Sequence, residues 1–190
     1  MKVLESKHIY LSTYENRYLE ALFSWENNLE ELNEWSTRKR VLPRARFKSE
    51  VENLTDNNDY DNYFFIINKN NEELIGYVGY TFLDLENGNF IIFMYVKADC
   101  RGMPINTEAL LIFLNYMFQY YPVIKVESSI FDYNKNSLNN VLSMGFQVEG
   151  IRRKHIFMHG KYCDEYLVAL FRDDFYEIFN KYKSYISPSK

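Results

Sequence analysis

Runs of apolar residues predict three consecutive strands in the middle of the chain. The runs are Tyr63–Asn68, Glu73–Leu83 and Phe90–Val96, and each is rich in β-branched and aromatic residues. Asn70-Asn71 marks the first turn between them, and Asn87-Gly88, a dipeptide typical of tight hairpins, marks the second. Because such short turns join antiparallel strands, the pattern predicts an antiparallel meander.

A strongly apolar segment, Thr107–Gln119, follows the meander and has the period of a helix. One helical stripe consists of Leu110, Phe113, Leu114 and Met117. Further apolar residues on the other faces predict burial on more than one side. Pro122 ends this helix, and Val123–Ile130 alternates as a strand. Since a helix that connects two strands of one sheet makes them parallel, we expect Phe90–Val96 and Val123–Ile130 to be parallel neighbours.

The remaining patterns predict elements at both ends of the chain. Before the meander we expect a strand at Ile9–Leu11, a helix from the capping box Ser12-x-x-Glu15 to about Asn27, and helices at Leu29–Trp35 and Arg46–Leu54. After it we expect a helix at Lys135–Met144 that faces inward with Leu138, Val141 and Leu142 and ends at a left-handed Gly145, a hairpin of Phe146–Met158 and Tyr162–Phe171, and a helix from Asp173 to about Tyr185.

A polar loop, Lys97–Asn106, lies between the last strand of the meander and the apolar helix. The first turn of a helix has backbone N–H groups without partners and the positive end of the helix dipole, so it binds anions. Arg101 stands in this loop and can add a charged hydrogen bond. The sequence therefore predicts an anion site where the loop enters the helix.

The order of these motifs resembles the GNAT superfamily of N-acetyltransferases, most closely the branch that acetylates ribosomal-protein N-termini and its relatives (RimJ/RimL-like). The matching residues are Arg101-Gly102-x-x-x-x-Thr107-Glu108-Ala109-Leu110, Asn134-x-x-Ser137 and Gly145-Phe146-x-x-Glu149-Gly150. The resemblance implies a mixed α/β fold, in which helices flank a central twisted sheet. That sheet would be mostly antiparallel, with one parallel strand pair that splays apart.

The resemblance also implies acetyl-coenzyme A as cosubstrate and assigns residues to it. Backbone amides of the loop would hold the pyrophosphate, which assigns Arg101, Gly102, Met103, Pro104, Ile105, Asn106 and Thr107. The acetyl-pantetheine arm would lie between the splayed strands and pair with exposed backbone at Tyr95 and Val96. Asn134 would contact the same arm, and Ser137 would lie near the thioester sulfur. Capping of the following helix explains Asn134 and Ser137 equally well.

Two positions depart from the family's loop, which reads Arg/Gln-x-x-Gly-x-Gly/Ala. The two glycine positions fall at Pro104 and Asn106. Proline has no N–H to donate, and Asn106 would have to adopt a left-handed or cap-like conformation. Two hypotheses therefore stay open: a coenzyme A-dependent N-acetyltransferase, and a protein of the same fold that has lost acetyl transfer and serves as a binding or regulatory module.

Amine acetylation needs a site for the coenzyme, a route to deprotonate the amine and a proton for the leaving thiolate, while proximity supplies much of the acceleration. The candidate acids are Ser137 and Tyr133, and the sequence assigns no base. His155, His159 and Cys163 have no catalytic partner at a suitable spacing and are interpreted as structural. The resemblance implies that the first helices flank the substrate cleft, which makes their acids candidates for contacting the amine, although such acids are more often simply solvated: Glu26, Glu30, Glu31 and Glu34.

Composition narrows the class of protein. The 190 residues, 47% of them hydrophobic, fit one domain spanning 1–190. A net charge of −4 argues against nucleic acid as a partner, and no apolar run has the length of a membrane span or a signal peptide. Cys100 and Cys163 follow no metal or disulfide spacing. We expect a cytoplasmic monomer or homodimer with no metal and no membrane partner, acting on a small-molecule or peptide amine.

Overall fold

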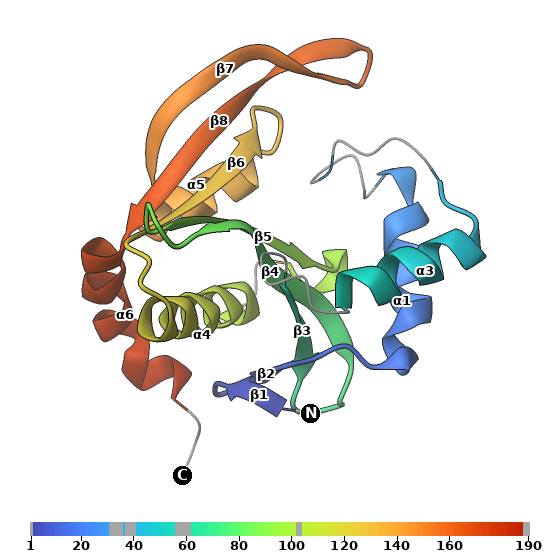
Figure 1. Ribbon diagram of the computed structural model, residues 1–190, viewed down its shortest axis with the longest axis horizontal. Coiled ribbons are helices and arrows are strands. Elements are labelled where there is room, and N and C mark those ends of the chain that lie inside the picture. Colours follow the sequence, from blue (N-terminus) through green and yellow to red (C-terminus); the bar gives the residue numbers. More distant parts are fainter. Residues whose placement is uncertain (1, 31–35, 37–40, 56–61, 102–103, 188–190) are drawn as a thin grey trace.

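The computed structural model describes residues 2–30, 36, 41–55, 62–101 and 104–187. Its strands form one eight-stranded sheet in the order β1-β2-β3-β4-β5-β6-β8-β7 (Figure 1). The strands are β1 (Lys2–Glu5), β2 (Ile9–Ser12), β3 (Asn62–Asn68), β4 (Leu74–Asp84), β5 (Asn89–Val96), β6 (Lys125–Phe131), β7 (Gln147–Met158) and β8 (Lys161–Phe171). β5 and β6 pair in parallel, and the other described neighbours are antiparallel. The mixed fold with one parallel pair confirms the prediction.

Helices cover both faces of this sheet (Figure 1). They are α1 (Leu19–Asn27), α3 (Arg44–Thr55), α4 (Pro104–Tyr120), α5 (Lys135–Ser143) and α6 (Arg172–Ile186), with short 3-10 turns η1 (Asn16–Tyr18) and η2 (Ala98–Cys100). α4 and α6 lie against one face, and α1 and α3 lie against the other. No helix in the part of the chain described is both long and apolar enough to cross a membrane.

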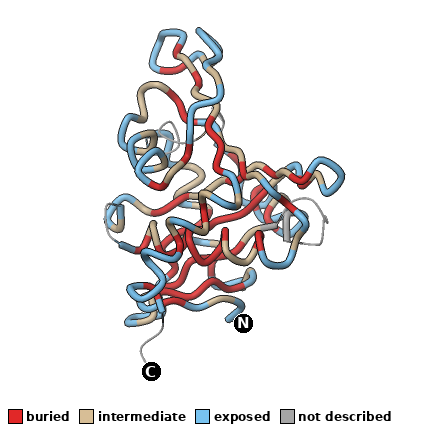
Figure 2. The backbone as a smooth tube through the Cα atoms, turned by 90° about the vertical axis from the view of Figure 1, so that its left-hand side faces the viewer, coloured by how far each residue is buried: buried red, intermediate tan, exposed pale blue. Residues whose placement is uncertain are grey.

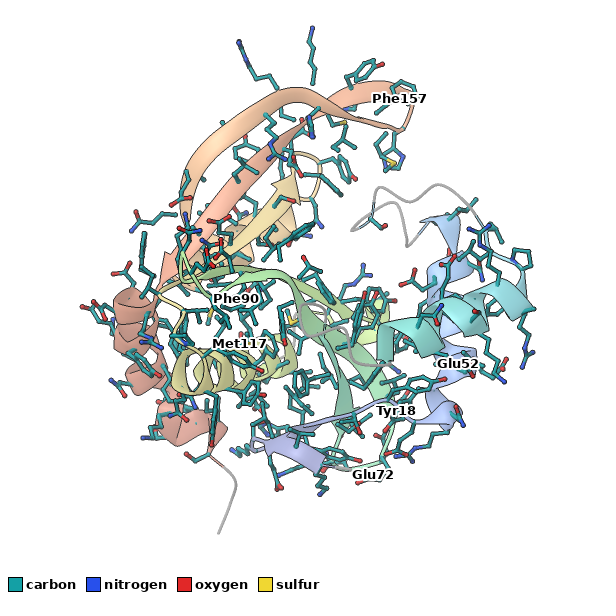
Figure 3. The ribbon with its side chains drawn as sticks, viewed as in Figure 1. Tyr18, Glu52, Glu72, Phe90, Met117 and Phe157 are labelled. Atoms are coloured by element: carbon teal, nitrogen blue, oxygen red, sulfur yellow. The ribbon has the colours of Figure 1, made fainter. Side chains whose placement is uncertain are left out.

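Alternation along the strands builds two hydrophobic cores, one on each face. Phe64 and Ile66 of β3 point into the α4 core, whereas Phe65 and Ile67 point into the core under α1 and α3. The α4 core is the larger, and Figure 2 shows the buried residues gathered in the interior of the molecule, with exposed segments around them. Phe90 of β5 and Met117 of α4 lie together within this core (Figure 3).

Several predicted elements have different boundaries in the structure. α4 begins at Pro104 rather than Thr107, because proline has the backbone angle of a first helical residue and needs no N–H there. The predicted capping box is wrong: Ser12 is buried in β2, its hydroxyl lies 3.2 Å from the Tyr18 hydroxyl, and the helix begins through η1 without a side-chain cap.

Other differences concern single elements. β1 was not predicted. It is a mostly exposed strand that pairs with β2. Leu138 and Val141 pack against the α4 core as predicted, but Leu142 is exposed. Gly145 ends α5 in the left-handed conformation, with φ of 86°, as predicted. The helix predicted at Leu29–Trp35 falls mostly outside the described residues.

Candidate functional site

The parallel strands β5 and β6 separate soon after they begin. They pair only at Asn89 with Lys125, Phe90 with Val126 and Ile91 with Glu127, although β5 runs on to Val96. At the point of separation the Ser128 hydroxyl donates to the Ile92 carbonyl over 3.3 Å. β4 stays paired with β5 up to Val96, so the gap opens only on the β6 side.

Backbone direction decides which residues of β5 face this gap. The Ile92 carbonyl points toward β6. Because backbone groups alternate in direction along a strand, those of Met94 and Val96 lie on the same side as those of Ile92. The Tyr95 carbonyl instead faces β4, where a Cβ added to Gly76 would lie 2.2 Å from its oxygen. Glycine at position 76 therefore lets β4 approach β5 closely. Of the two residues assigned from the sequence, only Val96 has its backbone toward the gap, and Met94 joins it.

The first turn of α4 supplies the backbone donors of the predicted anion site. Counted from Pro104 as the first helical residue, the amides of Ile105 and Asn106 fall in the turn that has no intrahelical acceptors. Thr107 comes one residue later, where the intrahelical hydrogen bonds begin. Asn106 adopts neither the left-handed nor the cap-like conformation expected from the sequence, because it lies inside the helix. Gly102 and Met103 lie outside the described residues.

The side chain of Asn106 is unusual for a first-turn residue. Its Oδ1 atom is buried and has no hydrogen-bond partner among the described residues. Buried polar atoms are almost always paired, and an unpaired one is destabilising. Rotation of the side-chain amide by half a turn would exchange Oδ1 and Nδ2, so either an acceptor or a donor can occupy this buried position. The first turn of α4 thus has a buried amide whose hydrogen bonding is incomplete.

Arg101 follows β5, and its side chain folds back onto the end of that strand. Its Nε donates to the Val96 carbonyl over 2.9 Å, and its guanidinium lies 5.9 Å from the centre of the Tyr95 ring. The side chain is otherwise exposed. The hydrogen bond to Val96 holds the Arg101 side chain at the end of β5, where the Val96 carbonyl lies on the gap side.

Tyr133, Asn134 and Ser137 follow the far end of β6, on the other side of the gap. The Asn134 side chain accepts from the Ser137 amide over 3.2 Å, so it caps α5 as expected. Tyr133 is half-buried between Phe131 and the edge-on ring of His159, with ring centres 5.4 and 5.6 Å away. Burial raises the pKa of Tyr133 to about 12, and the nearby Cys163 and Asp132 act in the same direction. The phenol therefore stays protonated at neutral pH.

The remaining candidate residues have structural partners. Glu127 of β6 forms a 2.8 Å ion pair with Lys125, which also contacts Glu149 at 2.9 Å. His155 Nε2 lies 3.6 Å from the buried Glu165 carboxylate. Both cysteines are free, and burial raises their pKa values, which keeps the thiols protonated and unreactive.

Across the sheet from α4, side chains of α1 meet the rings of β3, β4 and β5. The Tyr77 hydroxyl donates to the Glu26 carboxylate over 2.8 Å, and the Trp25 ring lies 5.1 Å from that of Tyr95. Burial raises the pKa of Tyr77 well above its usual value, with Glu26 adding to the effect. Glu26 is one of the four acids that were candidates for contacting the amine, and the sequence did not distinguish it from the other three. Of the other three, Glu30 is exposed, while Glu31 and Glu34 lie outside the described residues.

Comparison with known proteins places this arrangement among acetyltransferases. The family profile described as acetyltransferase (GNAT) domain matches residues 11–167. The SPbeta prophage-derived uncharacterized N-acetyltransferase YokL of Bacillus subtilis is 28% identical over 115 residues, and the uncharacterized N-acetyltransferase p20 of Bacillus licheniformis is 28% identical over 114. Each match covers 60% of this chain, and 65% and 64% of the respective relatives' lengths.

Solved structures share the fold at low sequence identity. RimJ of Mycobacterium smegmatis, in complex with CoA-disulfide, has a TM-score of 0.82 at 16% identity, with 98% of this chain and 95% of that one covered. Spermidine N-acetyltransferase of Vibrio cholerae, in complex with CoA and spermine, has a TM-score of 0.81 at 15% identity, with 89% of this chain and 98% of that one covered.

Proposed function

Because the chain belongs to the acetyltransferase (GNAT) domain family, we propose that it is an acetyl-coenzyme A-dependent N-acetyltransferase that acetylates a primary amine. The acceptor is the amine of a small molecule, of an amino sugar or of a protein N-terminus. In its narrower form the proposal places the chain in the RimJ/RimL-like branch, for which a protein N-terminus is the acceptor. The likeness to RimJ supports the fold of that branch.

One observation carries the proposal: β5 and β6 separate beside the first turn of α4. The fold therefore offers a gap for an extended pantetheine arm next to backbone amides that can bind an anion. The residues present fit the coenzyme. Ile105 and Asn106 would hold its pyrophosphate with first-turn amides, and Arg101 would add a charge. The backbone of Met94 and Val96 would pair with the pantetheine arm, and Asn134 would contact it from the opposite strand.

The coenzyme supplies an activated thioester, and the chain supplies position and a proton. The acceptor nitrogen would form the new bond to the acetyl carbon as the carbon–sulfur bond breaks, and the proton that the nitrogen loses would pass to solvent water. The leaving thiolate would take a proton from the phenol of Tyr133 or the hydroxyl of Ser137. The high pKa of Tyr133 ensures that its proton is present at neutral pH.

The second candidate function, a binding module that has lost acetyl transfer, rests on two features of the same loop. Pro104 contributes no backbone N–H to the first turn, and the Nε of Arg101 already donates to the Val96 carbonyl. Since proline is common at the first helical position, its presence there is compatible with an intact anion site. The amides of Ile105 and Asn106 follow it and favour the enzyme.

The test is calorimetric titration with coenzyme A together with an assay of acetyl transfer to a panel of primary amines. We expect binding in the parent chain, and a loss of about 1.5–3 kcal/mol in Arg101→Ala, the value of a charged hydrogen bond. Arg153→Ala, an exposed arginine of β7, is the matched control and should bind as the parent does. Absence of coenzyme A binding at millimolar concentration would refute the enzyme, and binding without transfer to any amine would favour the second candidate.

A further inference from the structure

A cluster of aromatic rings lies on the α1 face of the sheet beside the β5–β6 gap. We define the ring cluster as Tyr63 of β3, Tyr77 of β4 and Phe93 of β5. The ring centres of Tyr63 lie 4.6 Å from Phe93 and 5.6 Å from Tyr77, and those of Tyr77 and Phe93 lie 6.4 Å apart. Phe93 immediately precedes Met94, whose backbone faces the gap. The ring cluster therefore lies next to the place where the acetyl group would arrive.

A carboxylate joins these rings from α1. Glu26 accepts a hydrogen bond from the Tyr77 hydroxyl over 2.8 Å, and both Tyr63 and Phe93 are half-buried. Aromatic faces attract cations, and a carboxylate adds a counter-charge to that attraction. Rings and carboxylate together have the chemistry of an ammonium site.

The hydrogen bond from Tyr77 indicates which ammonium group is held. A donor to a carboxylate stabilises its anion and weakens it as a base. Glu26 is therefore suited to pairing with a cation that keeps its proton. The nitrogen that is acetylated must lose its proton, so the held cation is a second one on the same acceptor.

We propose that Glu26 and the ring cluster form a subsite for a second, unreacting ammonium group, and hence that the acceptor is a small-molecule diamine rather than the protein N-terminus of the narrower proposal. This inference rests on the proposed function. Glu26 and the rings of Tyr63 and Phe93 contact the distal cation, and Tyr77 is a positioning residue that holds the carboxylate. The coenzyme site on the α4 side contains none of these groups.

The test compares two acceptors of equal length, 1,4-diaminobutane and 4-amino-1-butanol, in which a hydroxyl replaces the distal ammonium. We expect the parent chain to prefer the diamine by roughly ten-fold or more in kcat/KM, beyond the two-fold factor from its two equivalent amines. In Glu26→Gln the preference should fall to about that two-fold factor through a raised KM for the diamine, with the amino alcohol unaffected. Tyr77→Phe keeps the ring and should raise the diamine KM by a smaller factor.

The control is Glu20→Gln, which removes an exposed carboxylate of the same helix that pairs with Arg44. It should keep the preference of the parent. Coenzyme A affinity, measured by calorimetry, should be equal in all the variants, which shows that each one folds. Equal use of both acceptors by the parent, a preference retained in Glu26→Gln, or transfer to neither acceptor despite coenzyme binding would each overturn the diamine subsite. Absence of coenzyme binding in the parent would instead overturn the proposed function on which it rests.

Discussion

The buried carboxylate of Glu108 in α4 ties this helix to the turn between β1 and β2. It is 2% exposed and accepts from the Ser6 hydroxyl at 2.6 Å and the His8 amide at 3.1 Å, while His8 Nδ1 lies 2.5 Å from its second oxygen. A buried charge persists only where such partners replace water. Glu108 therefore fixes the start of α4, and with it the proposed anion site, against the edge of the sheet.

We predict that Glu108→Ala lowers the free energy of unfolding by about 2–3 kcal/mol, because it leaves the Ser6 and His8 donors without their acceptor. Glu52→Ala, which removes a largely exposed carboxylate of α3, is the control and should change stability by less than about 0.5 kcal/mol. Urea denaturation of both variants measures the difference. A cost for Glu108→Ala no larger than that of the control would show that the buried contacts do not hold α4.

Tyr133 is the candidate acid with the more specific environment, enclosed by Phe131 and His159. We predict that Tyr133→Phe lowers kcat by roughly 100-fold while coenzyme A affinity changes by less than about three-fold, because a proton donor acts on the leaving group and not on binding. Ser137→Ala, measured in the same steady-state assay, tests the second candidate acid. A full rate in Tyr133→Phe together with a slow Ser137→Ala would assign the proton to Ser137.

At the scale of elements, Asn134 has two roles that mutation can separate. As the cap of α5 it needs only an oxygen that accepts from the Ser137 amide. Asn134→Ala should therefore cost about 1 kcal/mol of stability, and Asn134→Asp should cost much less. If the residue also contacts the coenzyme, Asn134→Asp binds coenzyme A more weakly although it is as stable as the parent, because it lacks the amide NH2. Thermal unfolding and calorimetry on the two variants decide between capping alone and both roles.

The elements that sequence patterns predicted are those fixed by local chemistry. β3, β4 and β5 follow from β-branched and aromatic runs, and the turns at Gly88 and Gly145 have the positive φ that glycine permits. The missed features depend on neighbours distant in the chain. Ser12 looks like a helix cap until β3 pairs with its strand, and β1 is recognisable only through its pairing with β2.

The candidate site shows the same division. The position of the anion site follows from a loop that enters a helix, but the sequence alone did not show that Pro104 is its first helical residue. Which backbone groups face the gap depends on the neighbouring strands, so the sequence did not show that the Tyr95 carbonyl faces β4 or that the backbone groups of Met94 lie on the gap side. Glu26 stood out from the other acids only after folding brought it to Tyr77, which lies 51 residues later in the sequence.

For the whole molecule, the β5–β6 gap divides the sheet into two parts that meet along a short stretch of pairing. One part consists of β1 to β5, and the other consists of β6, β8 and β7. Beyond Ile91 the described strands of the two parts are joined by the Ser128 hydrogen bond and not by a continued ladder. A ligand that fills the gap adds contacts to both parts at once and should therefore stabilise the entire fold.

We predict that coenzyme A raises the melting temperature more than adenosine 3′,5′-bisphosphate, which has phosphates but no pantetheine arm. Ligand at 100 times its Kd stabilises the folded state by about 2.7 kcal/mol. For a chain of this size, each kcal/mol corresponds to a shift of roughly 2–4 °C, so saturating coenzyme A should raise the midpoint by about 5–10 °C. At the same concentration the bisphosphate can occupy only the α4 end and should give a shift less than half as large. Equal shifts from the two ligands, measured by differential scanning calorimetry, would show that the pantetheine arm does not enter the gap between β5 and β6.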